Sequence, residues 1–264
     1  MRIRQAQDLC GGFLTSRKAG YCIHRNHNAS SVKMRIGGLQ KYSLIDFPPQ
    51  ISCVVFTAGC NFHCPYCHNP DLAAPGPDTQ KLSANEIWQF LEARGKYLDA
   101  VVISGGEPTL QPDLVDFCRQ IRSRGFALKI DTNGSHPEVI RELIGRDLVN
   151  YIAMDIKTVP ERYPTAISDH IDPEAIRQTV RIILDSGLSH EFRTTCVKPF
   201  TDAAAVAEMA GLIRGADLHA IQKPRTENVL SPEFFKNNDR LHTDEELAQF
   251  RSVFAETVSR AIIR

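Results

Sequence analysis

Residues 100–125 read AVVISGGEPTLQPDLVDFCRQIRSRG and contain one complete strand–helix unit. The run AVVIS is apolar and rich in β-branched residues, which indicates a buried strand. The second half carries apolar residues at helical spacing and ends at Gly125, as is typical of a helix that stops at a glycine. Between the two lies the polar segment SGGEPT, at the carboxyl end of the strand.

The same unit recurs along the chain, and its repetition predicts the fold. Strict alternation of strands and helices predicts a parallel sheet with right-handed crossovers. Six strands are two short of a closed eightfold barrel, so an open partial barrel and a doubly wound sheet both fit. The predicted strands are 51–59, 100–106, 126–134, 148–158, 190–200 and 218–224; the predicted helices are 82–95, 112–125, 137–145, 172–187, 203–215 and 243–263.

Composition and charge narrow the class of protein. The chain has 264 residues, with 31 Lys plus Arg against 31 Asp plus Glu. This balance disfavours a nucleic-acid binder. No apolar run approaches the ~18 residues of a membrane helix, and no secretory signal is apparent. We therefore expect a cytoplasmic protein, in which the eight cysteines favour metal binding or redox chemistry over disulfides.

Residues 1–33 differ from the rest, because they are basic and lack helical or alternating periodicity. A targeting peptide, a flexible basic arm and sequence upstream of the native start all fit this composition. We favour the third interpretation, because Met34 opens a segment that runs directly into the first predicted strand. The expected organisation is thus a disordered or mis-annotated extension, 1–33, followed by one domain, 34–264.

Unusual polar groups follow every predicted strand. Because function gathers at the carboxyl ends of strands in such folds, these groups should meet at one rim. Buried polar groups are costly unless they bind something or each other. The groups are the cysteine loop after the first strand, SGGEPT (104–109), DTNG (131–134), MDIK (154–157), Arg193 with Thr195, and Gln222 with Lys223.

The cysteine loop reads GCNFHCPYCHNP over residues 59–70 and spaces its thiols as C-x3-C-x2-C. A structural zinc site takes four ligands, which His63 or His68 could complete. Small buried cysteines are a second simple interpretation. A [4Fe–4S] cluster usually has four thiolates, so three leave one iron open for another ligand. An open coordination position is typical of a catalytic metal site rather than a structural one.

The cysteine spacing, the aromatic Tyr66 before the last cysteine and the later Gly-Gly-Glu-Pro strand end resemble the radical S-adenosylmethionine enzymes. The resemblance implies a partial (β/α)6 barrel of parallel strands with outer helices. It also implies an oxidoreductase in which one [4Fe–4S] cluster cleaves S-adenosylmethionine reductively, giving a 5′-deoxyadenosyl radical that abstracts a hydrogen atom. The cofactors carry that chemistry, and the protein orients them.

The resemblance assigns expected roles residue by residue. Three cysteines match the cluster ligands, and the remaining positions match the cofactor site. No protein group beyond these is expected to be catalytic. In relatives, the two aspartates of these strand ends help to hold a monovalent cation beside the cofactor carboxylate, and Asp131, Thr132 and Asp155 match those positions here. The cluster residues are Cys60, Cys64 and Cys67; the cofactor residues are Tyr66, Gly105, Gly106, Glu107, Asp131, Thr132, Asp155 and Lys157.

Within the superfamily, CPYCHNP and the DTNG and MDIK strand ends resemble the activating enzymes of glycyl-radical enzymes. SLIDFP (43–48) and SGGEPTLQ are most like the activating proteins of anaerobic ribonucleoside-triphosphate reductase. The resemblance implies a separate glycyl-radical enzyme as partner and an electron donor such as flavodoxin or ferredoxin. Asp46 matches a residue near the partner's glycine loop, although the Asp-Gly-Pro-Gly of pyruvate formate-lyase activators reads Asp46-Phe47-Pro48-Pro49 here, so that Phe47 and Pro49 replace the two glycines.

Two other functions remain open at this stage. One is a radical enzyme that acts on a small molecule, as a deazapurine synthase does, which would share the compact fold. The other is a non-catalytic zinc or interaction module built on the same cysteines.

Overall fold

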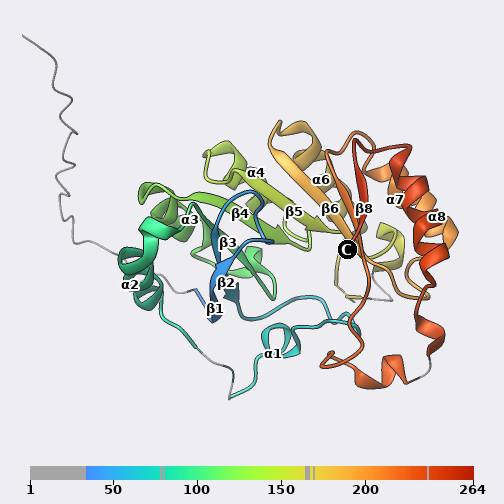
Figure 1. The fold of residues 1–264 in the computed structure, drawn as a ribbon, viewed down its shortest axis with the longest axis horizontal. Coiled ribbons are helices and arrows are strands. Elements are labelled where there is room, and N and C mark those ends of the chain that lie inside the picture. The colour runs from blue at the N-terminus through green and yellow to red at the C-terminus, as the bar shows by residue number, and fades with distance from the viewer. Residues whose placement is uncertain (1–33, 78, 80, 164–166, 169, 237) are drawn as a thin grey trace, which may run out of the picture. The chain divides into compact units, whose positions relative to one another are not determined.

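The strands form one sheet of eight, ordered in space as they are in sequence (Figure 1). The computed structural model describes residues 34–77, 79, 81–163, 167–168, 170–236 and 238–264. β1 runs antiparallel to β2, and each later pair of neighbours is parallel. The strands are β1 Ile36–Ser43, β2 Ser52–Thr57, β3 Ala100–Gly105, β4 Ala127–Thr132, β5 Tyr151–Asp155, β6 Ser189–Thr195, β7 His219–Gln222 and β8 Ala261–Ile263.

The longer helices cover the outer face of the curved sheet, while α1 lies apart from them (Figure 1). The predicted α/β fold with a mostly parallel sheet is thereby confirmed. None of the helices in the described residues is long and apolar enough to cross a membrane. The helices are α1 Pro70–Ala73, α2 Ala84–Arg94, α3 Leu114–Ser123, α4 Pro137–Gly145, α6 Pro173–Asp185, α7 Ala203–Leu212 and α8 Asp244–Ala255; five short 3₁₀ turns are Gly95–Tyr97, Pro108–Leu110, Pro160–Arg162, Pro232–Phe235 and Asn238–Arg240.

Local sequence explains where the helices begin. Ser83 caps α2, and its hydroxyl and backbone N–H pair with Glu86 in a capping box. Thr243 and Glu246 form the same arrangement at α8. Each box satisfies N–H groups that the first helical turn leaves without partners.

Both edges of the sheet depart from the sequence prediction. The last predicted helix, 243–263, is wrong in its second half, because α8 ends at Ala255 and residues 261–263 form β8. There the β-branched pair Ile262–Ile263 extends along β7 and covers an edge that would otherwise present unpaired backbone groups. At the other edge β1 was not predicted, since Gly37 and Gly38 interrupt any alternating pattern.

The two faces of the sheet differ in character. Alternate residues such as Val101 and Ile103 face the helices and join the large hydrophobic core. Val102 belongs to a separate small cluster on the inner face. The inner positions of later strands are charged, which is unusual for a barrel interior. They carry Lys129 and Asp131 on β4, Asp155 on β5, and Glu191 and Arg193 on β6.

The prediction for residues 1–33 lies outside the described residues.

Candidate active site

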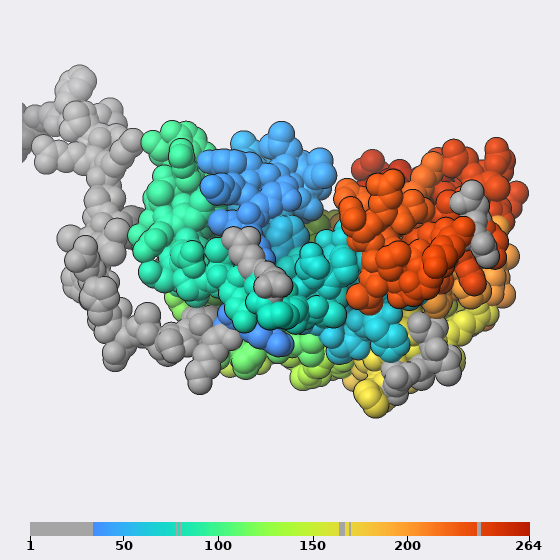
Figure 2. All heavy atoms as spheres, turned by 90° about the horizontal axis from the view of Figure 1, so that it is seen from below, coloured from blue at the N-terminus to red at the C-terminus, as the bar shows by residue number. Residues whose placement is uncertain are grey.

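A cavity of about 430 Å³ opens at the carboxyl ends of the strands. Seen from below (Figure 2), the surface is hollowed between the blue residues near β1 and β2 and the orange residues that follow β7. The lining includes every residue for which the sequence predicts a role: Cys60, Cys64, Tyr66, Cys67, Gly105, Gly106, Glu107, Asp131, Thr132, Asp155 and Lys157.

The cysteine loop is fixed by its backbone rather than by regular secondary structure. Gly59 N–H donates to Leu72 O at 2.7 Å, and Cys60 N–H donates to Ala73 O at 3.1 Å. At the far end, Cys67 N–H donates to Cys64 O at 3.0 Å, which closes a turn. These contacts hold the three cysteines on one wall of the cavity.

The thiols of this loop are shielded from water. Burial raises the pKa of Cys60 to about 11 and that of Cys64 to about 12. In the metal-free protein both are therefore neutral thiols at pH 7. A metal centre must displace their protons, because metal ligands are thiolates.

Tyr66 lies beside the thiols with its ring packed against Phe200 and Phe234, at centroid distances of 5.6 and 6.3 Å. Its hydroxyl is buried, and no group of the described part of the chain forms a hydrogen bond of ordinary geometry with it. Burial, followed by the nearby Cys64 thiol, raises the pKa of the hydroxyl. A buried donor without a partner is costly, so this hydroxyl is suited to a ligand in the cavity.

Gly105 and Gly106 allow neighbouring strand ends to approach closely. Gly105 has a φ of +120°, and a Cβ there would lie 2.3 Å from Thr57 O. A Cβ on Gly106 would lie 2.2 Å from Gly59 O, in the cysteine loop. Both contacts are to backbone, which cannot move aside cheaply. The glycines therefore bring the tip of β3 against the loop that carries the thiols.

Glu107 connects the ends of β3 and β4 through hydrogen bonds. Its carboxylate is 1% exposed and accepts from Thr109 N–H and Oγ1, Thr132 Oγ1 and Asn133 N–H, at 2.6 to 3.0 Å. Burial raises the pKa of Glu107 although these hydrogen bonds oppose it. The carboxylate thus already has four donors, and its main structural role is to join two strand tips.

Four charged side chains form the polar floor of the cavity. Arg193 Nε lies 2.6 Å from Asp155 Oδ1, and Arg193 Nη1 lies 3.2 Å from Asp131 Oδ2. Lys157 Nζ lies 3.0 Å from Asp155 Oδ2. Burial alone would raise the pKa of Asp155, but Arg193 and Lys157 outweigh it and hold the pKa below its usual range. The same pairing holds the pKa of Lys157 above its usual range in spite of burial.

The sequence assigned no role to several residues of this site. Arg193 was noted as a polar residue at a strand end, and its alternation with Glu191 and Thr195 could have placed it on the inner face. Ser104 donates to Asp131 Oδ2 at 3.0 Å and lines the cavity. Arg225 lies beyond a strand in irregular structure, where no sequence pattern marks it.

Lys223 was predicted at the same rim, and that prediction is wrong. Its ammonium lies 2.6 Å from Asp244 Oδ1, and it does not contribute to the cavity. Successive side chains of a strand point to opposite faces, so Gln222 faces the cavity and Lys223 faces away.

The donor set fits an iron–sulfur cluster with an associated ligand. Three thiols share one wall, and within the described residues neither the Tyr66 hydroxyl nor Asp131 Oδ1 has a hydrogen-bond partner, although Lys129 Nζ lies 3.5 Å from Asp131 Oδ1. In the described part of the chain, no three His, Cys, Asp or Glu side chains converge on a point that could hold a single metal ion. Zinc requires such convergence, whereas each thiolate of a cubane binds a different iron.

Comparisons with known proteins agree with this chemistry. The profile of the "Radical SAM superfamily" matches residues 54–210. The "Putative glycyl-radical enzyme activating enzyme MJ1227" of Methanocaldococcus jannaschii is 34% identical over 238 residues, which cover 88% of this chain and 97% of that protein. The "Pyruvate formate-lyase-activating enzyme" of Clostridium pasteurianum is 33% identical over 138 residues, covering 48% of this chain and 54% of that protein.

Among solved structures, Streptococcus suis SuiB bound to precursor peptide SuiA has a similar fold, with a TM-score of 0.61 at 12% identity. The match covers 79% of this chain and 48% of SuiB, so the chain spans about half the length of that protein. Together, the profile match and the relatives show that the chain belongs to the radical SAM superfamily of enzymes, which use a [4Fe–4S] cluster and S-adenosylmethionine.

Proposed function

We propose that this protein is an activating enzyme that generates a glycyl radical on a separate partner enzyme. The observation that carries the proposal is the grouping of three thiols and the polar ends of six strands around one cavity. The likeness to glycyl-radical enzyme activating enzymes over most of the chain supports the same function.

Cys60, Cys64 and Cys67 are the proposed ligands of one [4Fe–4S] cluster. Three ligands leave one iron for the amino and carboxylate groups of S-adenosylmethionine. When bound, the reduced cluster and this cofactor supply the one-electron chemistry that removes a hydrogen atom from the partner's glycine.

The remaining residues are proposed to hold the cofactor. Lys157 and Arg193 are both cationic and line the cavity, which suits the cofactor carboxylate. Tyr66 offers a buried ring and a free hydroxyl to the adenosine portion. Gly105 and Gly106, with backbone groups at the tip of β3, lie where the cofactor amine is expected. A monovalent cation at Asp131, Thr132 and Asp155 stays a prediction. In this structure the guanidinium of Arg193 already supplies a positive charge to both carboxylates.

The proposed partner is an anaerobic ribonucleoside-triphosphate reductase, on the sequence resemblance of residues 43–48 and 104–111. Asp46 lines the cavity mouth, where a glycine loop of the partner would enter. A flavodoxin or ferredoxin is the proposed electron donor. We propose a cytoplasmic location, because a reducing compartment keeps clustered cysteines free to bind a metal centre instead of forming disulfides.

The test is anaerobic reconstitution with iron and sulfide, followed by dithionite reduction in the presence of S-adenosylmethionine. We expect cleavage of the cofactor, and a glycyl radical doublet in the EPR spectrum when the reductase subunit is added. Cleavage without a doublet on any added glycyl-radical enzyme, together with turnover of a small molecule, would identify a small-molecule radical enzyme instead. Stoichiometric zinc with no iron–sulfur absorbance would reject the enzyme itself.

A further inference from the structure

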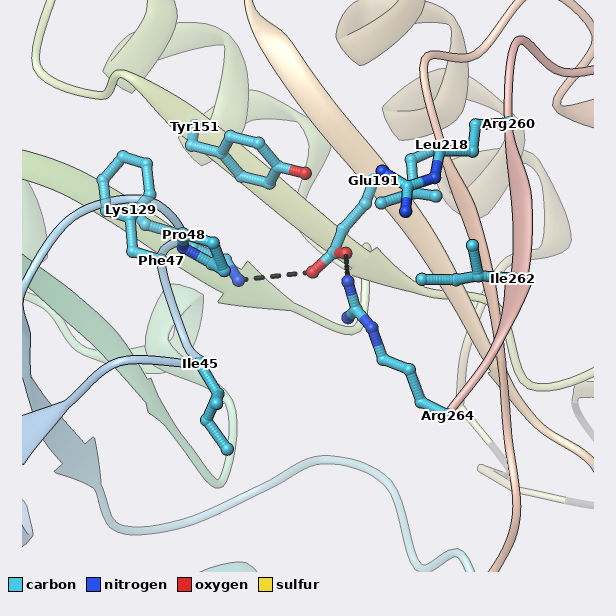
Figure 3. A pocket seen from close by; sticks show the side chains of 10 residues that line it. All are labelled: Ile45, Phe47, Pro48, Lys129, Tyr151, Glu191, Leu218, Arg260, Ile262 and Arg264. Carbon is cyan, nitrogen blue, oxygen red and sulfur yellow. Dashed lines mark hydrogen bonds and ion pairs between the residues drawn. The ribbon is translucent and has the colours of Figure 1, made fainter.

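A second cavity, which we name the basal cavity, lies toward the amino-terminal ends of the strands (Figure 3). Its volume is about 320 Å³, at the lower end of the range for small-molecule sites, about 300–1,000 Å³. Lys129, Tyr151 and Glu191 belong to the first halves of β4, β5 and β6, whereas the candidate active site lies at the opposite ends of these strands. The lining is Ile45, Phe47, Pro48, Lys129, Tyr151, Glu191, Leu218, Arg260, Ile262 and Arg264.

The basal cavity carries an excess of positive charge. Lys129, Arg260 and Arg264 supply three positive charges, and Glu191 supplies the one negative charge among the lining residues. Glu191 is itself neutralised, since its carboxylate lies 3.3 Å from Lys129 Nζ and 2.9 Å from Arg264 Nη2. The side chains of Lys129 and Glu191 are only 4% and 2% exposed. This pair is thus part of the interior, and Lys129 Nζ also lies 3.5 Å from Asp131 Oδ1. Arg260 is therefore the cation of the lining that has no ion pair with a described residue.

Two hydrogen-bond donors in the basal cavity lack a protein partner. Arg260 makes no ion pair or side-chain hydrogen bond with any described residue, and the Tyr151 hydroxyl donates to none of them. In Figure 3 this hydroxyl points into the cavity, and the Arg260 and Arg264 side chains reach in from the β8 side. The planar guanidinium group of arginine can donate two parallel hydrogen bonds, which match the geometry of carboxylate and phosphate oxygens.

The rest of the wall is apolar. Phe47 packs against the Tyr151 ring at a centroid distance of 5.6 Å, and Leu218 and Ile262 face the same space. Ile45 is 80% exposed at the edge of the cavity. A few convergent polar groups within apolar walls are typical of a small-molecule site.

We propose that the basal cavity binds a small organic anion. A phosphate or carboxylate group would meet Arg260, Arg264 and the Tyr151 hydroxyl, and an apolar or aromatic portion would lie against Phe47 and Ile262. The unpaired Arg260 guanidinium and the Tyr151 hydroxyl carry this inference, because ion pairing within the fold already satisfies Lys129, Glu191 and Arg264. The site stands independently of the proposed activating function.

The experiment is isothermal titration of the full chain with three probes: phenyl phosphate, inorganic phosphate and benzoate. The first combines both features of the proposed ligand, and the other two separate phosphate from carboxylate recognition. We expect phenyl phosphate to bind, with Arg260→Gln weakening it at least tenfold and Tyr151→Phe weakening it severalfold. Arg260 is exposed, so its replacement leaves the fold intact.

Two controls locate the binding. Arg146→Gln removes the same charge from an exposed pair with Glu142 on α4 and should leave affinity unchanged. Arg225→Gln removes an arginine from the active-site cavity and should also have no effect. The inference is overturned if none of the probes binds at millimolar concentration, if Arg260→Gln and Arg146→Gln behave alike, or if Arg225→Gln is the variant that abolishes binding. None of these readouts depends on cluster loading.

Discussion

Arg193 Nε lies 2.6 Å from Asp155 Oδ1, across neighbouring strands at the floor of the active-site cavity. The same guanidinium contacts Asp131 through Nη1, so one cation holds two carboxylates in place. All three side chains are at most about a quarter exposed, with Asp155 at 27%. The floor is therefore a fixed electrostatic platform rather than a set of loose surface pairs.

Arg193→Gln should destabilise the protein by about 2 kcal/mol, because Asp131 and Asp155 lose their shared cation and keep only Lys129 and Lys157 as partners. Urea denaturation of the metal-free protein measures this loss. Adding Asp131→Asn to Arg193→Gln should recover part of it, since this removes a carboxylate left with Lys129 alone at 3.5 Å, while Lys129 keeps Glu191 as its partner. Strict additivity of the two single changes would mean that the two side chains do not interact.

Cys64→Ala should abolish iron binding and cleavage of S-adenosylmethionine while the fold remains. Cys64 packs at the edge of the hydrophobic core, but Cys64→Ala removes only its sulfur atom, and the strands and longer helices build most of that core. Iron content and circular dichroism report the two effects separately. Cys118→Ala is the matched control, because Cys118 is buried on α3 in the core. Cys118→Ala should keep its iron; cofactor cleavage by Cys64→Ala would rule Cys64 out as a ligand.

Gly106→Ala should cost about 2 kcal/mol of stability, as overpacking against backbone commonly does. The new Cβ would lie 2.2 Å from Gly59 O and 3.0 Å from Leu72 O, so the cysteine loop must shift. Gly211→Ala provides the contrast, because Gly211 lies in α7 with open space around its Cβ position. That change should be neutral or stabilise by about 0.5 kcal/mol. Equal melting temperatures for the two variants would contradict the close approach of the two loops.

His219 should make the protein sensitive to mild acid. The ring is fully buried, stacks on Phe254 at a centroid distance of 3.6 Å and pairs with Thr194 Oγ1 through Nε2. Burial lowers the pKa of His219 to about 3. The unfolded chain protonates this histidine near pH 6.5 and the folded protein does not. The contribution of His219 to stability is therefore present above pH 6.5 and is lost as the pH falls from about 6.5 toward 3.

The expected slope is up to about 1.4 kcal/mol per pH unit over that window. His219→Gln removes the titrating group, so its unfolding free energy should depend less on pH between 6.5 and 4, while at pH 8 the contribution from titration is absent in both proteins. Denaturation series at these values test the prediction. Parallel pH profiles for variant and wild type would show that His219 is protonated in the folded state.

The sequence predicts the central strands and their tips well, because their β-branched and apolar residues are interrupted at each strand end by glycine and polar residues. The edge strands were missed for a physical reason. β1 contains two glycines and polar residues along an open edge, and β8 is three residues long. Neither is long or regular enough to show periodicity, and both are fixed by pairing with a neighbour far along the chain.

The candidate site likewise contains residues that local sequence patterns reveal and residues that only the fold brings together. Cysteine spacing and the Gly-Gly-Glu turn are local patterns, so they are visible in sequence. The ion pairs of Arg193 join residues 38 and 62 positions apart. Such contacts depend on strand order and facing, which no short window of sequence contains. Lys223 shows the corresponding error, since its position at a strand end was correct and its side of the sheet was not.

The charged interior of the barrel limits which amino-acid substitutions this protein can tolerate during evolution. Lys129 contacts Asp131 and Glu191, and Arg193 reaches both of these carboxylates as well. A single replacement at any of these four positions strands an opposite charge in a poorly hydrated space. Acceptable changes must therefore arrive in compensating pairs. Among descendants of a common ancestor, positions 129, 131, 191 and 193 should evolve as one correlated unit, either retaining four charges or exchanging them together for apolar side chains.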